Sequence, residues 1–268
     1  MAGLSINEVT TYRWTFEEDV AQYRACGIEA IGVWRQKLAD FGEAKGVELL
    51  ADSGLAVSNL LWAGGFTGSD GHSYHESLAD ARHALKLAAA LGTRQLVVYS
   101  GSRNGHTQNH ARRLFVAALG DLLPLAADLD VTLCVEPMHP SCAEDWTFLT
   151  DLDDAVALVK GVGNPFLKLV FDTYHWGHAC DIAARVGPLA EHIGIVHLSD
   201  GTCAPNCEQN RHRLGDGDVP LACIIQSLRK AGYDGYYDVE LFGETIENSD
   251  YRQLLECSKR AYERLLAG

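Results

Sequence analysis

Basic residues are scarce in this chain, where 22 Lys and Arg stand against 36 Asp and Glu, for a formal net charge of −14. Proteins contact nucleic-acid phosphates mainly through Lys and Arg, and anionic membrane surfaces also attract cations. The acidity therefore argues against nucleic-acid and membrane partners, and its simplest role is solubility. No apolar run approaches the ~20 residues of a membrane-spanning helix. The start of the sequence shows no basic stretch followed by an apolar one, so we expect no signal peptide.

Paired cysteine motifs are also lacking, because the eight cysteines are scattered along the chain. Cys203 and Cys207 stand in TCAPNCEQN, one residue further apart than the commonest zinc pair and without a second pair. We therefore expect no structural zinc, and the role of this loop stays open. Because we expect no export, the thiols should be reduced and the protein cytoplasmic.

The chain does contain a regular alternation of strand-like and helix-like segments. The apolar, β-branched segments predict eight strands at 5–11, 30–34, 57–62, 95–100, 132–137, 167–173, 194–198 and 236–241. Amphipathic stretches between them predict helices at 17–26, 74–91, 111–129, 153–161, 221–232 and 251–266. The length of 268 residues is typical of a (β/α)8 barrel. Since no linker divides the chain, we predict a single α/β TIM-barrel domain over residues 1–268.

Four of the expected strands end on side chains that bind metals. The segments TLCVEPMHP, LKLVFDTYHWG, IGIVHLSDG and YYDVELFGE supply Glu136, Asp172, His197 and Glu240. Sites in parallel α/β folds are built at the carboxyl ends of the strands. Three carboxylates and one imidazole at four successive strand ends therefore predict a hard, oxygen-rich site for one divalent metal ion.

Polar and aromatic residues near these strand ends are candidates for substrate contact. Arg211 lies in the long loop GTCAPNCEQNRHRLGDGD, where a cation would hydrogen-bond an oxygen-rich substrate. Trp62 precedes a Gly-rich stretch and is a candidate for stacking on a sugar ring, and Tyr12 is a weaker candidate of the same kind. For His175 the sequence leaves two roles open, substrate contact or a hydrogen bond to a metal ligand. Asp200 either orients His197 or caps the next turn.

In these segments the chain resembles the xylose isomerase-like sugar isomerase and epimerase superfamily. The resemblance covers essentially the whole barrel and is carried by the order and spacing of VEP, FDxxH, VHLSD, RxxxGDG and YDGYYDVEL. It implies one Mn²⁺, Mg²⁺, Co²⁺ or Zn²⁺, with Mn²⁺ favoured, bound by the four residues named above. It also implies a small sugar substrate in carbohydrate metabolism, proton transfer by Glu136 and Glu240, and substrate contacts from His175 and Arg211. Barrels of this type often form homodimers or homotetramers.

The resemblance leaves two reactions open. Isomerisation or epimerisation removes a proton beside a metal-polarised carbonyl of a keto-sugar or polyol and passes through an enediolate. However, His139 follows Glu136 in EPMHP, as in lyases that split 3-oxo-glycosides, where it would be the base. Two flanking prolines fix the direction of this histidine, which favours a proton-transfer role. The alternative is thus a metal-dependent lyase or dehydratase acting on a 3-oxo-glycoside or an inosose.

A phosphodiesterase of the endonuclease IV type would share the barrel and the Asp-x-x-His motif. It would need further histidines at strands two to four, where this chain has Trp34, Trp62 and Tyr99, and a basic face. The sequence therefore argues against it.

Overall fold

Eight parallel strands form a closed barrel in chain order in the computed structural model, which describes residues 3–267. The strands are β1 (Leu4–Asn7), β2 (Ala30–Trp34), β3 (Ala56–Gly64), β4 (Gln95–Tyr99), β5 (Thr132–Val135), β6 (Leu167–Asp172), β7 (Ile193–Leu198) and β8 (Tyr237–Val239). The closing pair is β1 with β8, also parallel. The predicted (β/α)8 fold is confirmed.

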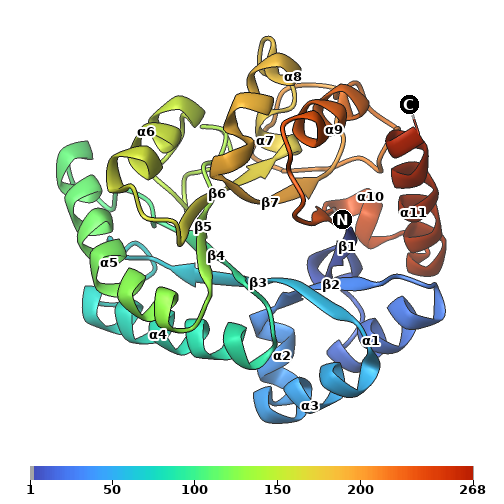
Figure 1. Ribbon diagram of the computed structural model, residues 1–268, viewed down its shortest axis with the longest axis horizontal. Helices are drawn as coiled ribbons and strands as arrows, with labels where there is room; N and C mark the ends of the chain where they lie inside the picture. Colours follow the sequence, from blue (N-terminus) through green and yellow to red (C-terminus); the bar gives the residue numbers. More distant parts are fainter. Residues whose placement is uncertain (1–2, 268) are drawn as a thin grey trace.

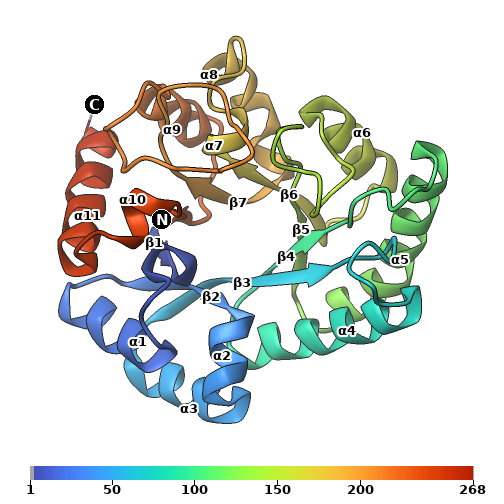
Figure 2. The same cartoon turned by 180° about the vertical axis from the view of Figure 1, so that it is seen from behind.

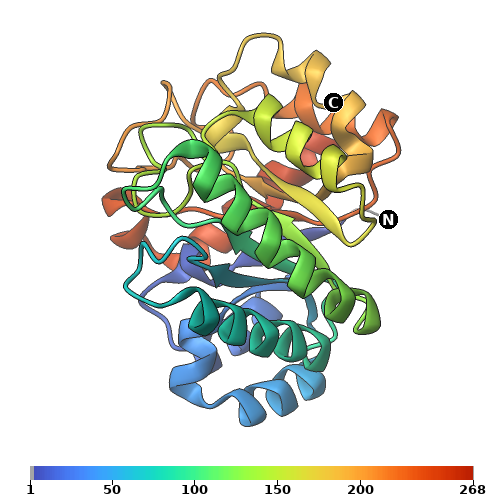
Figure 3. The same ribbon diagram turned by 90° about the vertical axis from the view of Figure 1, so that its left-hand side faces the viewer.

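Helices surround the barrel as an outer ring (Figures 1 and 3). They are α1 (Phe16–Ala25), α2 (Arg35–Phe41), α3 (Glu43–Ser53), α4 (Tyr74–Ala90), α5 (Gln108–Asp128), α6 (Leu152–Val162), α7 (Thr173–Trp176), α8 (Ile182–Arg185), α9 (Leu221–Lys230), α10 (Glu244–Glu247) and α11 (Tyr251–Ala267), with 3-10 helices η1 (Glu8–Thr11) and η2 (Gly187–His192). Within residues 3–267, no helix has the length and apolarity needed to cross a membrane.

The main core lies between the barrel wall and the ring of helices. Leu85 of α4, Phe115 and Leu119 of α5 and Leu254 of α11 are fully buried there. Burial of each such side chain contributes roughly 1.5–3 kcal/mol. This apolar layer fixes the strands from outside and leaves their carboxyl ends to carry function.

The barrel interior is apolar on one side and polar on the other. Val97, Val170 and Ile195 belong to the apolar cluster inside the barrel. Opposite them the buried Asp238 carboxylate accepts hydrogen bonds of 2.8 Å from the side-chain amides of Asn7 and Asn59. Gly32 makes room for this contact, since a Cβ there would lie 2.4 Å from Asp238 Oδ2.

Two predicted segments differ from the structure. The first strand was expected to continue to Thr11, but β1 ends at Asn7, whose side chain accepts a hydrogen bond of 3.1 Å from the Val9 amide. This Asx turn starts η1 instead. The expected (β/α)8 fold implied one helix between β2 and β3, for which no range was predicted, whereas the structure has two, α2 and α3, separated by Gly42 at a φ of 107°. Propensity alone did not indicate this helical pair.

Candidate metal centre and its mouth

Glu136, Asp172, His197 and Glu240 lie together at the carboxyl end of the barrel. Glu136 and Glu240 directly follow β5 and β8, while Asp172 and His197 belong to β6 and β7 and are paired in register. One ligand atom from each residue lies within 4.8 Å of all the others, and all four side chains are buried. The structure thus brings together the four residues that the sequence proposed as ligands, in a cluster that could hold a metal ion.

The donor atoms of this cluster fit a hard divalent cation. His197 Nδ1 faces the carboxylates, 3.2 Å from Glu240 Oε2 and 3.6 Å from Glu136 Oε1. Among the described residues, Glu136 Oε2 and both ring nitrogens of His197 are buried without a hydrogen-bond partner. A buried polar atom left unpaired costs about 1–3 kcal/mol, and coordination of an ion by Glu136 Oε2 and one nitrogen of His197 would remove that cost for these two atoms. A hard oxygen-rich set with one imidazole suits Mn²⁺ or Mg²⁺.

Burial and mutual charge shift the ionisation of the cluster. Burial raises the pKa of Glu136, and the charges of Glu240 and Asp172 add to that rise. Burial acts in the same direction on Glu240, but Arg211 and His197 outweigh it and lower its pKa to about 2. Burial opposes the charge on His197, yet Glu240 and Glu136 raise its pKa well above the usual value. Because a metal-binding imidazole must be neutral, binding of a metal by this cluster would be coupled to release of the His197 proton.

Arg211 lies over the carboxylates and is itself almost fully buried. Its guanidinium contacts Asp172 Oδ2 at 2.8 Å and Glu240 Oε2 at 2.7 Å. Phe242 and Tyr174 flank its cationic group at 4.2 and 5.0 Å from the ring centroids. Within the described chain its Nε has no hydrogen-bond partner, although it is buried. Arg211 therefore neutralises part of the cluster and keeps one N–H donor unused.

The long loop between β7 and α9 is anchored so that Arg211 reaches this place (Figure 2, orange). Asp200 pairs with His212 through two backbone hydrogen bonds of 2.9 and 3.1 Å. The Asp200 carboxylate accepts further bonds from the backbone amides of Gly201, Gly215 and Val219. Of the two roles left open for Asp200, the structure shows the turn-capping one.

The two other predicted histidines occupy different positions. His175, in α7, is 2% exposed, and its Nε2 lies 3.7 Å from Asp172 Oδ2. Burial lowers the pKa of His175 to about 4, so the ring is neutral at neutral pH. His139 is half-buried, and its Nδ1 accepts a hydrogen bond of 3.3 Å from the Ser141 amide. A neutral His139 ring can then only donate, through Nε2.

The metal cluster opens into a cavity of about 310 Å³, here called the mouth cavity. Glu240 and Arg211 form its base, and Trp62 and Tyr12, both proposed from the sequence, line it. Tyr12 is 54% exposed and stands at the rim. Sequence reasoning missed the other lining residues, which are Val9, Trp34, Tyr99, Met138, Trp146, Gln209, Phe242 and Glu247. Trp34 and Tyr99 stand at the ends of β2 and β4, a signal that could have identified them as candidates.

The fold and the site define a class: (β/α)8 barrels with an acidic, metal-type cluster at the carboxyl ends of strands five to eight. The chain belongs to the xylose isomerase-like TIM barrel family, because the sequence model of that family matches residues 20–261. The family resemblance inferred from the motifs is thereby confirmed.

Similar proteins are known in sequence and in structure. L-ribulose-5-phosphate 3-epimerase UlaE of Escherichia coli O157:H7 (strain EC4115 / EHEC) is 27% identical over 178 residues, 65% of this chain and 58% of that protein. The chain therefore matches little more than half the length of such relatives. Protein SMc04130 of Sinorhizobium meliloti 1021 is 27% identical, with a TM-score of 0.90 over 98% of both chains. The IOLI protein, solved with a zinc atom, shares the fold at a TM-score of 0.85 and 19% identity over 99% of this chain and 98% of that one.

Proposed function

We propose that this protein is a divalent-metal-dependent sugar isomerase or epimerase that transfers a proton beside the carbonyl of a keto-sugar or related polyol. The observation that carries this proposal is the buried cluster of three carboxylates and one imidazole at the base of an aromatic-walled cavity. The sugar epimerases among the relatives point to the same class of reaction.

The residues have distinct roles in this proposal. Glu136, Asp172, His197 and Glu240 would hold the ion, which would polarise the substrate carbonyl and so acidify the proton beside it. Glu136 and Glu240, which directly follow β5 and β8, also take up and return the proton through a carboxylate oxygen. Arg211 donates its unused Nε–H to a substrate oxygen.

The surrounding side chains support these groups. His175 contacts a substrate oxygen in this proposal, because both of its buried ring nitrogens lack a hydrogen-bond partner among the described residues. Trp62 and Tyr12 present aromatic rings to the substrate from the wall and rim of the mouth cavity. Mn²⁺ is the proposed ion, with Mg²⁺, Co²⁺ and Zn²⁺ as the other candidates. The proposed setting is cytoplasmic, without nucleic-acid or membrane partners, and the proposed assembly is a homodimer or homotetramer, which light scattering on purified protein tests.

Proton exchange in D2O is the direct test of the reaction. Metal-loaded protein is incubated with keto-sugars, inososes and 3-oxo-glycosides, and deuterium at the carbon beside the carbonyl is followed by NMR. We expect metal-dependent exchange with a keto-sugar, together with formation of its epimer or isomer. Elimination of water or an alcohol would establish the lyase reaction instead, and a lack of reaction with every substrate would contradict the proposal.

A further inference from the structure

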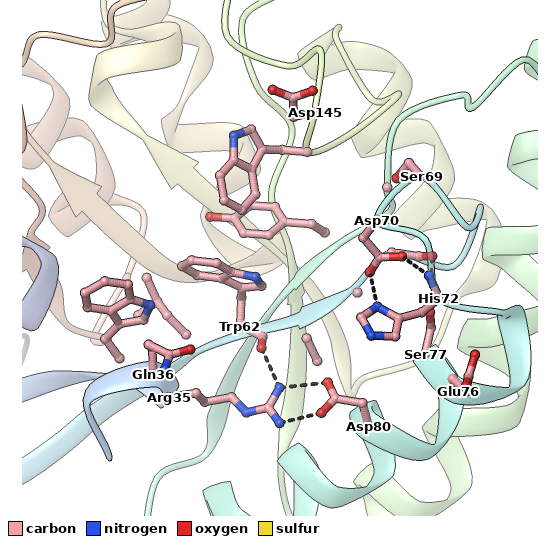
Figure 4. Close-up of a pocket in the computed structure, with 18 of the residues that line it drawn as sticks. Arg35, Gln36, Trp62, Ser69, Asp70, His72, Glu76, Ser77, Asp80 and Asp145 are labelled. Carbon is pink, nitrogen blue, oxygen red and sulfur yellow. Dashed lines mark hydrogen bonds and ion pairs between the residues drawn. The ribbon is translucent and has the colours of Figure 1, made fainter. Parts of the chain in front are cut away.

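A second cavity of about 500 Å³ adjoins the mouth cavity, and we call it the side pocket. It lies among α2, the segment that follows β3, and the start of α4 (Figure 4). Four aromatic residues line both cavities: Trp34, Trp62, Tyr99 and Trp146. A molecule that reaches the metal cluster through the mouth therefore has a second compartment within reach.

The shared wall is a continuous aromatic surface. Trp62 packs edge-on against Trp146 with ring centroids 5.1 Å apart, and it contacts Tyr99 at 5.7 Å and Trp34 at 6.4 Å. Trp146 and Tyr99 are 5.4 Å apart. Large rings of this kind offer rigid apolar faces, which match the C–H faces of a sugar ring.

The remaining surface of the side pocket is rich in hydrogen-bond acceptors. Asp70, Glu76 and Asp145 are among its lining residues, and Figure 4 shows their carboxylates. Gly64 and Gly65 line it as well. A carboxylate has about four lone-pair sites, so the partners that Asp70 and Glu76 already have leave acceptor capacity for hydroxyl groups. An aromatic floor with a rim of acceptors suits a polyhydroxylated ring.

The charges in both cavities disfavour an anionic substrate. Among the described lining residues, Arg35 and Arg211 are the only Lys or Arg. Arg35 is held by Asp80 through two hydrogen bonds of 2.7 and 2.8 Å and also donates to the Trp62 carbonyl (Figure 4). Arg211 is held by Asp172 and Glu240. Carboxylates therefore neutralise both guanidinium charges, which leaves no free cation for a phosphate, and the rim carboxylates would repel one.

We propose that the side pocket binds a second, uncharged sugar ring, so that the substrate is a glycoside of a keto-sugar rather than a free or phosphorylated monosaccharide. The keto-sugar unit occupies the mouth cavity with its carbonyl at the metal cluster, and the second ring lies against Trp62 and Trp146. The reaction of the keto-sugar unit rests on the proposed function. Binding of the second ring is measured separately, by calorimetry.

Ala39 provides a test that leaves the metal site untouched. It is an exposed residue of α2 that lines the side pocket but not the mouth cavity. Ala39→Trp should fill part of the side pocket. Ala51→Trp, at an exposed position of α3 that lines neither cavity, is the matched control. The substrates are fructose and two keto-disaccharides that carry a second sugar on fructose, lactulose and isomaltulose, each also tested for binding by calorimetry.

The expected result is a kcat/KM for a keto-disaccharide at least tenfold above that for fructose. Ala39→Trp should reduce disaccharide turnover and affinity tenfold or more while changing fructose turnover less than twofold, and Ala51→Trp should change neither. Equal effects of Ala39→Trp on both kinds of substrate would overturn the assignment. A fructose exchange rate as high as that of the disaccharides would also overturn the assignment of the side pocket. That result would leave the proposed function intact. If neither these ketoses nor any substrate of the exchange panel reacts, the proposed function falls, and calorimetry still tests the side pocket. Disaccharide binding that Ala39→Trp weakens tenfold would support the assignment, and the absence of such binding would overturn it.

Discussion

Replacement of Arg211 by Met should destabilise the protein strongly when metal is chelated and weakly when metal is saturating. The side chain is 3% exposed and contacts Asp172 and Glu240 at 2.8 and 2.7 Å. Removal of one partner from a buried ion pair costs about 3–5 kcal/mol, because the other charge is left buried and uncompensated. For a chain of this length, that cost lowers the melting temperature by on the order of 10 °C. A bound divalent cation would compensate the same carboxylates and reduce the loss.

The assay is thermal unfolding in excess chelator and in saturating Mn²⁺. Arg213→Met, in the same loop, is the matched control, since no ion pair involves Arg213 within the described residues. By linkage, Arg211→Met should bind metal more tightly than the wild type, because its unloaded form is the more destabilised one. An equal loss of stability in chelator and in Mn²⁺ would refute the reasoning.

The same variant should also lose substrate affinity. If the Arg211 Nε–H bonds a substrate oxygen, the loss of a charge-assisted hydrogen bond costs roughly 1.5–3 kcal/mol. This corresponds to a decrease of about 10- to 100-fold in kcat/KM, seen mainly as a higher KM. Steady-state kinetics at saturating metal measures this decrease. An unchanged kcat/KM would show that Arg211 only pairs with the carboxylates of Asp172 and Glu240 and does not bind substrate.

Three further predictions concern residues outside the ligand set. His139→Gln should bind metal and keep most of its turnover, since the Nδ1 of His139 is bonded to the Ser141 amide, whereas loss of a true general base would cost ~10²–10⁴-fold. Asp19→Asn should lower the free energy of unfolding by about 3–5 kcal/mol, measured by urea unfolding at neutral pH. The buried Lys37 ammonium lies 2.6 Å from the Asp19 carboxylate in the wild type, and the variant leaves this charge without its carboxylate partner. Glu8→Gln should cost less than about 1 kcal/mol at acidic pH, because burial raises the pKa of the Glu8 carboxyl well above 4.5 and so favours its neutral form, which Gln resembles. Since the unfolded state ionises Glu8 more readily than the folded state does, the wild type should lose stability relative to Glu8→Gln as pH rises above 4.5, and a constant difference would contradict this sign.

The metal cluster was predictable because each ligand ends a buried strand. Periodicity located β5 to β8 closely, and parallel topology then brings consecutive strand ends to one face. Glu136, Asp172, His197 and Glu240 therefore needed only strand order to be placed together. The expected order was correct for all eight strands.

Contacts made across the barrel were not predictable from local pattern. The sequence placed Arg211 in a loop over the mouth. The ion pairs of Arg211 with Asp172 and Glu240, however, depend on the conformation of that loop, which hydrogen bonds to Asp200 hold in place. Trp146, far along the chain from Trp62, carries no sequence signal for the aromatic wall that they form. Such pairs depend on loop conformation, which side-chain periodicity does not encode.

The most direct test of the account is the metal content of purified protein, measured by mass spectrometry together with exchange in D2O. The variant is Glu240→Gln, and Glu247→Gln is its control, because Glu247 lines the same mouth cavity but lies outside the ligand cluster. We predict about one divalent ion per chain and metal-dependent exchange in the wild type and in Glu247→Gln. Glu240→Gln should lose both the ion and the exchange. Full metal occupancy and undiminished exchange in Glu240→Gln would contradict the central claim.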